Sequence, residues 1–96
     1  MGNFNMEAFD ELFMAVLKLK SKEDCRKFFE DVCTIKELQD VTQRLEVAAL
    51  LKSGKNYQEV SKATGASTAT ISRVNKCLNY GSGGYALVID DKKEKL

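Results

Sequence analysis

Small hydroxyl side chains and two cations gather between positions 67 and 76 of the sequence. Hydroxyls can exchange hydrogen bonds with base edges, a threonine methyl can contact a thymine methyl, and arginine can bind guanine or phosphate. Serine, threonine and alanine stabilise an exposed helix less than glutamate, lysine or glutamine do, but they let a helix enter the major groove closely. This pattern predicts DNA contacts at Ser67, Thr68, Ala69, Thr70, Ser72, Arg73 and Lys76, joined by Gln58 and Lys62 from the preceding segment.

The distribution of charge supports the same chemistry. Residues 1–51 carry seven Lys or Arg and ten Asp or Glu, a net charge of −3, whereas residues 52–80 carry five and one, a net charge of +4. Phosphate binding requires such a concentration of positive charge. The candidate phosphate contacts are Lys55, Gln58, Lys62 and Lys76, although any one of them alone is more commonly a solvated side chain.

Two short helices must position these side chains. Helices are expected at 57–63 and 68–79, and only Thr64-Gly65-Ala66-Ser67 connects them. A glycine in so short a turn between two helices is typical of a helix-turn-helix, because glycine adopts a positive φ without steric cost. Asn56 with Glu59 forms a capping-box pattern, and Ser67 suits the N-cap of the second helix. The apolar positions expected to meet between the helices are Val60, Ala66, Ile71 and Val74.

Three further helices are expected before this unit. Their limits are an Asn5 cap to about Lys20, a start at Ser21 with Asp24, and a Thr34 with Glu37 capping box to about Ser53, with Gly54 as the C-cap. No segment alternates with period two and the chain has no proline, so the fold class is all-α, with about six helices.

Apolar stripes run along the first two of these helices at the spacing i, i+3, i+4, i+7. They are more extensive than a helix-turn-helix alone could cover, so a second copy of the chain is expected to cover part of them, which predicts a homodimer. The stripes consist of Phe9, Leu12, Phe13, Val16 and Leu17 in the first helix, and Cys25, Phe28, Phe29, Val32 and Cys33 in the second.

The C-terminal segment begins with Gly81-Ser82-Gly83-Gly84, which is expected to end the recognition helix and act as a flexible joint. Residues 85–89 could form a short strand or a final helix; a lone strand has no partner, so the helix is favoured. Residues 90–96 are charged and expected to fray. The predicted organisation is one domain, with a dimerisation scaffold at 5–53, the helix-turn-helix at 56–80, and the joint and last segment at 81–96.

The composition bounds the class of protein. The 96 residues, of which 44% are hydrophobic and 30% charged, predict one small folded domain. No apolar run could span a bilayer and no signal peptide follows Met1, so a cytoplasmic location without membrane contact is expected. Cys25, Cys33 and Cys77 lack metal-ligand spacing and histidine is absent, which predicts reduced, partly buried thiols with neither a disulfide framework nor a metal.

Two functional hypotheses follow. The first is a sequence-specific, DNA-binding transcriptional regulator, for which Arg73→Ala should weaken binding more than a change at Lys92. The alternative is a protein-interaction module that keeps the helix-turn-helix fold without binding DNA. An enzyme is disfavoured, because no nucleophile, base and stabilising site occur together.

The motif GASTATISRVNKCL, preceded by QRLEVAALLKSG, resembles the Trp repressor superfamily and, more closely, the bacterial Trp-repressor-like YerC/YecD family. The resemblance covers about residues 5–90. It implies an intertwined homodimer that presents two recognition helices to successive major grooves, and a regulator that is usually a repressor. The half-sites of its operator would then lie about 34 Å apart.

The resemblance also implies an effector pocket at Thr34, Arg44, Arg73 and Cys77, although Arg44 could instead extend to solvent. Two positions depart from the tryptophan-binding pattern. Val74 replaces a glycine, and Cys77 replaces a serine. Because a valine side chain would fill the space of the indole ring, tryptophan is not expected as a corepressor, no cofactor is expected, and any small-molecule effector remains to be identified.

Overall fold

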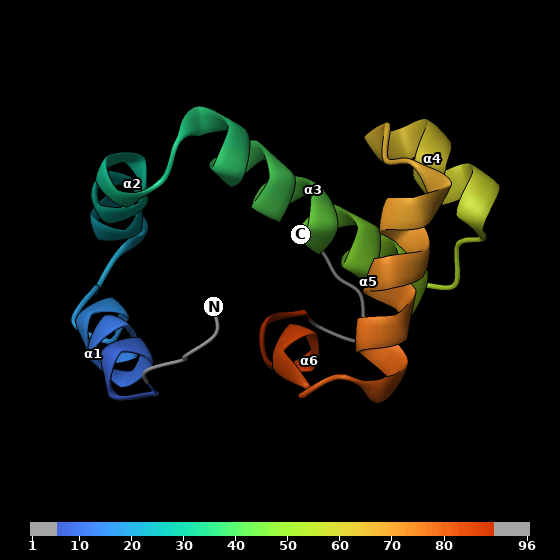
Figure 1. The fold of residues 1–96 in the computed structure, drawn as a ribbon. Helices are drawn as coiled ribbons and strands as arrows, with labels where there is room; N and C mark the ends of the chain where they lie inside the picture. Colours follow the sequence, from blue (N-terminus) through green and yellow to red (C-terminus); the bar gives the residue numbers. More distant parts are fainter. Residues whose placement is uncertain (1–5, 90–96) are drawn as a thin grey trace. The chain divides into compact units, whose positions relative to one another are not determined.

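Residues 6–89 are described by a computed structural model of the chain, and all the regular elements that they form are helices (Figure 1). These residues fall into two compact units, of which the first ends at Ile35 and the second begins at Lys36. The all-α prediction is therefore confirmed. No helix within the described range is long and apolar enough to cross a membrane.

The first unit contains α1 (Met6–Val16) and α2 (Lys22–Val32). The predicted start of α2 is confirmed, since the Ser21 hydroxyl accepts a hydrogen bond of 3.0 Å from the Asp24 N–H. The prediction that the first helix reaches Lys20 is wrong. The N–H groups of Lys18 and Leu19 bond to carbonyls three residues back, which tightens the last turn and ends the helix at Val16. The predicted Asn5 cap lies outside the described residues.

Neither α1 nor α2 buries a residue within the chain. Phe13 is 57% exposed and Leu17 is 75% exposed. On α2, Phe28 and Phe29 pack edge to face with ring centroids 5.1 Å apart. The apolar stripes predicted from the spacing are thus present, and much of their surface remains exposed in a single copy.

The long helix α3 (Ile35–Lys52) belongs to the second unit except for its first residue. Its predicted end is confirmed: Gly54 has a φ of 99°, and its N–H donates to the Leu51 carbonyl oxygen. The helices α4 (Tyr57–Thr64) and α5 (Thr68–Tyr80) lie against the C-terminal half of α3 (Figure 1).

A small core joins these three helices. Its members are at most 2% exposed and are all aliphatic. Because these side chains are small to medium in size, the helices can pack closely against one another. The four residues predicted to meet between α4 and α5 are all in it, and α3 adds two more. The core consists of Val47, Ala48, Val60, Ala66, Ile71 and Val74.

The last helix, α6 (Gly84–Val88), confirms the favoured prediction for this segment. Tyr85 and Ile89 anchor it by packing against the core. The joint before it depends on a close approach at Gly81, where an added Cβ would lie 2.5 Å from the Cys77 carbonyl oxygen. The expected fraying of residues 90–96 concerns positions outside the described range.

Candidate nucleic-acid interface

The turn between α4 and α5 is built around Gly65. This residue follows the last residue of α4 and has a φ of 77°, in the left-handed region that the sequence predicted. Its N–H donates to the Ser61 carbonyl oxygen at 2.8 Å, which closes α4. Thr64, expected in the turn, belongs to α4, so only three residues separate the helices.

Hydroxyl groups hold the turn together. The Thr64 hydroxyl donates to the Val60 carbonyl oxygen at 2.8 Å and accepts from the Ala66 N–H at 3.1 Å. The Ser61 hydroxyl donates to the Ala66 carbonyl oxygen at 2.9 Å. The two bonds to Ala66 satisfy backbone groups that lie in the turn, outside both helices.

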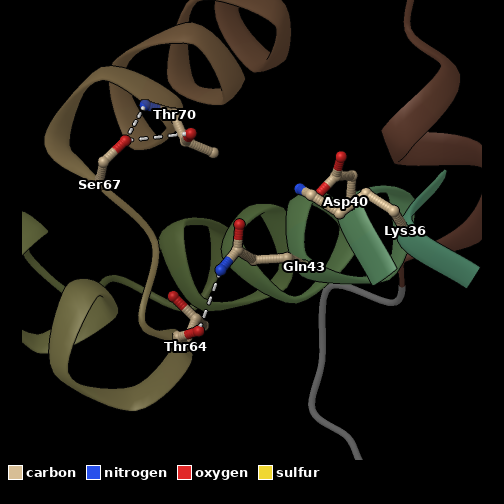
Figure 2. Close-up of polar contacts among 6 residues, drawn as sticks. All are labelled: Lys36, Asp40, Gln43, Thr64, Ser67 and Thr70. Atoms are coloured by element: carbon tan, nitrogen blue, oxygen red, sulfur yellow. Dashed lines mark hydrogen bonds and ion pairs between the residues drawn. The ribbon is translucent and has the colours of Figure 1, made fainter. Parts of the chain in front are cut away.

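Both predicted helix starts are confirmed. Asn56 and Glu59 form a reciprocal capping box, with bonds of 2.8 and 2.9 Å. At α5, the Ser67 hydroxyl accepts from the Thr70 N–H at 3.1 Å and donates to the Thr70 hydroxyl at 3.2 Å (Figure 2). Because the Thr70 hydroxyl accepts this bond, its own hydrogen is left for a further acceptor.

The predicted DNA contacts form an accessible face of the helix-turn-helix. Thr70 is half-buried beside Ser67, and the other predicted contacts are exposed. Ile71 and Val74 point into the core from the opposite side of α5. The exposed members of the set are Gln58, Lys62, Ser67, Thr68, Ala69, Ser72, Arg73 and Lys76.

Gln43 has a role that the sequence did not reveal. Its side-chain amide donates to the Thr64 carbonyl oxygen at 3.2 Å, which links α3 to the end of α4 (Figure 2). Nearer the start of α3, Lys36 and Asp40 form an exposed ion pair of 2.8 Å. The available signal for Gln43 was its position, four residues before the buried Val47 on one helix face.

The predicted effector residues are distributed over both units. Thr34 is in the first unit, whereas Arg44, Arg73 and Cys77 are in the second. Arg44 is half-buried, and Arg73 and Cys77 are exposed. Between Arg73 and Cys77 on α5, Val74 is 1% exposed and belongs to the core.

An open, mainly apolar groove of about 500 Å³ runs along α3, α5 and α6. Of the predicted effector residues, Cys77 lines this groove, whereas Arg44 and Arg73 do not. The groove is lined by Val41, Leu45, Cys77, Gly81, Ser82, Gly84, Tyr85 and Val88.

All three cysteines are free thiols. The expectation that they are partly buried fits Cys33 but is wrong for Cys25 and Cys77, which are exposed. Cys77 lies on the groove side of α5, and α6 leaves its thiol accessible.

Known proteins resemble this chain along most of its length. The family model for the Trp repressor protein matches residues 7–93. The uncharacterized protein YerC of Bacillus subtilis (strain 168) is 53% identical over 85 residues, which are 88% of this chain and 82% of YerC.

Two solved structures are also similar. A candidate Trp repressor from Staphylococcus aureus superposes with a TM-score of 0.82 at 46% identity, covering 85% of this chain and 82% of the other. A TrpR-like protein from Eubacterium eligens ATCC 27750 has a TM-score of 0.82 at 51% identity, covering 85% and 84%.

Proposed function

This chain belongs to the Trp repressor protein family, and on that premise we propose that it is a sequence-specific DNA-binding regulator of transcription, acting as a repressor. The recognition helix α5 enters the major groove, where Thr68, Thr70 and Ser72 meet base edges. Arg73 binds guanine or phosphate. Gln58, Lys62 and Lys76 contact the phosphate backbone on either side.

The observation that carries this proposal is the exposed face of α5. The turn before this helix is fixed by the Gly65 C-cap of α4 and the Ser67 N-cap of α5. The face has hydroxyl and basic side chains and no acidic residue in the helix. A major groove accepts such a helix, because small side chains permit close approach and the cations neutralise phosphates.

A homodimer completes the proposal. The exposed apolar stripes of α1 and α2 are the surfaces that a second copy would cover, since contiguous apolar surface of this kind marks interaction sites. Two copies related by a twofold axis would present two recognition helices, so the operator would be a pseudo-palindrome with half-sites about 34 Å apart.

Selection of bound sites from random DNA by the purified protein tests the proposal. The expected product is a pseudo-palindromic site whose affinity falls steeply as salt rises. Arg73→Ala should abolish this selection. Failure of the wild-type protein to retard any DNA at low salt would contradict the proposal and favour the protein-interaction module.

Tryptophan is not the effector in this proposal. Val74 is buried in the core beside Arg73, at the position where the tryptophan-binding pattern has glycine, and a valine side chain there would occupy the space of an indole ring. Titration calorimetry should detect no heat of binding with tryptophan at millimolar concentration. Saturable binding at micromolar concentration would contradict this part of the proposal.

A further inference from the structure

The hydrogen bond from Gln43 to Thr64 connects α3 to the point where the chain turns toward the recognition helix. The two residues are 21 positions apart, and the amide nitrogen lies 3.2 Å from the carbonyl oxygen. Thr64 is the last residue of α4, and carbonyls at a helix C-terminus have no partner within the helix. Gln43 therefore satisfies a backbone group that would otherwise depend on solvent.

The other hydrogen bonds of the turn are local. Those made by the side chains of Ser61, Thr64 and Ser67 span five residues or fewer. They make the turn rigid internally, but they do not fix its orientation on α3.

The core shared by α3 and the helix-turn-helix is apolar. Val47 and Ala48 of α3 pack against the aliphatic residues of α4 and α5. Apolar burial is non-directional, so it sets how closely the helices approach more strongly than it sets their rotation. A hydrogen bond is directional and supplies the missing constraint.

We propose that Gln43 is a positioning residue, whose bond to Thr64 fixes the rotation of the helix-turn-helix on α3 and hence the direction in which α5 meets DNA. This inference rests on the proposed function. In a homodimer, a rotational error at each copy changes the separation of the two recognition helices. Gln43 therefore governs the preference for half-site spacing rather than the affinity for a single half-site.

Two substitutions remove the bond in different ways. Gln43→Met retains side-chain length and helix propensity but has no donor. Gln43→Glu retains the shape and places a carboxylate oxygen against the Thr64 carbonyl. The matched control is Gln39→Met on the same helix, because Gln39 is exposed and has no side-chain hydrogen bond among the described residues.

The first experiment needs no DNA. Residual dipolar couplings of the full-length protein should fit one common orientation for α3 and α5 in the wild type and in Gln39→Met. In Gln43→Met and Gln43→Glu, the couplings of α4 and α5 should shrink relative to those of α3, while both variants still unfold in a single cooperative urea transition. Unchanged couplings in both Gln43 variants would overturn the proposal.

The second experiment uses operators whose two half-sites are moved apart in steps of one base pair. The wild type and Gln39→Met should bind the best spacing far more tightly than its neighbours. In Gln43→Met, the ratio of the affinity for the best spacing to the affinity for its neighbours should fall roughly fivefold, which corresponds to the free energy of one neutral hydrogen bond. The affinity for a single half-site should not change. Equal loss for single and paired half-sites would overturn the positioning role. Absence of DNA binding by the wild type would refute the proposed function but would leave the coupling result to decide the structural part.

Discussion

At the residue scale, the interface separates side chains that face outward from those that maintain the turn. Lys62, Ser72 and Arg73 are exposed, whereas Ser61 and Thr64 bind backbone groups of the turn. Substitutions in the first group should alter DNA binding with little effect on folding. Substitutions in the second group should alter stability.

Gly65 illustrates the second group. A Cβ at this position meets nothing within 4 Å, yet the φ of 77° is unfavourable for any residue with a side chain. Gly65→Ala should therefore lower the free energy of unfolding by about 1–2 kcal/mol through backbone strain alone. Urea denaturation measures this loss. Gly84→Ala is the control, since its Cβ also meets nothing and its φ is not positive; it should be neutral or slightly stabilising.

The outward group permits a sharper test, because phosphate and base contacts respond differently to salt. Lys62→Gln should weaken binding to all sequences alike and reduce the slope of log K against log salt by about one per copy of the chain. Ser72→Ala should leave the slope unchanged and alter the preference for one base pair per half-site. Fluorescence anisotropy over a salt series measures both, with Lys27→Gln on α2 as the control. Equal slopes for Lys62→Gln and the wild type would remove Lys62 from the phosphate contacts.

At the scale of the elements, the recognition helix depends on its first turn. Ser67 caps α5 through the Thr70 N–H, so Ser67→Ala should lower the free energy of unfolding by about 1 kcal/mol, and Ser67→Gly by only a few tenths. Thermal unfolding followed by circular dichroism checks the order. Ser82→Ala is the control, since Ser82 is exposed and has no side-chain hydrogen bond among residues 6–89. A loss of the same size in Ser82→Ala would contradict the capping role.

The elements were largely predictable because their signals are local. Asn56 with Glu59, Ser67, and the glycines at 54 and 65 mark helix ends by residue type within four positions, and the structure contains each of these caps and turns. The end of α1 was missed because no glycine or proline marks it. The Gln43–Thr64 bond was missed for a different reason: its partners are 21 residues apart, and no local pattern encodes the meeting of α3 with the end of α4.

The inward and outward faces of the candidate site could also be predicted from the sequence. Spacing identified Val60, Ile71 and Val74 as inward-facing residues, and burial confirms all three. The opposite face of α5 follows from helical geometry. Spacing could not predict the hydroxyl pair of Ser67 and Thr70, because it depends on side-chain rotation rather than position in the sequence.

At the scale of the whole molecule, the dominant feature is exposed apolar surface on α1. Phe13→Asp changes a side chain that is 57% exposed in one copy, so it should cost a monomer little. If a second copy covers this residue, the dissociation constant of the dimer should rise by at least about tenfold. This factor corresponds to the free energy gained by burying one large apolar side chain. Sedimentation equilibrium over a dilution series measures the change, with Asp10→Asn on the same helix as the control. Identical dissociation constants would exclude Phe13 from the interface.

The lack of buried residues in α1 and α2 also bears on how long a chain survives in the cell. A newly made copy that has found no second copy presents these helices to proteases, because segments with few buried contacts open readily. Two copies that cover each other's helices, as in the proposed homodimer, would be protected. For a dimeric regulator, surplus single chains would then be cleared faster than assembled ones, and the amount of protein would vary less than the rate of its synthesis. Pulse-chase measurement should show faster turnover of Phe13→Asp than of the wild type.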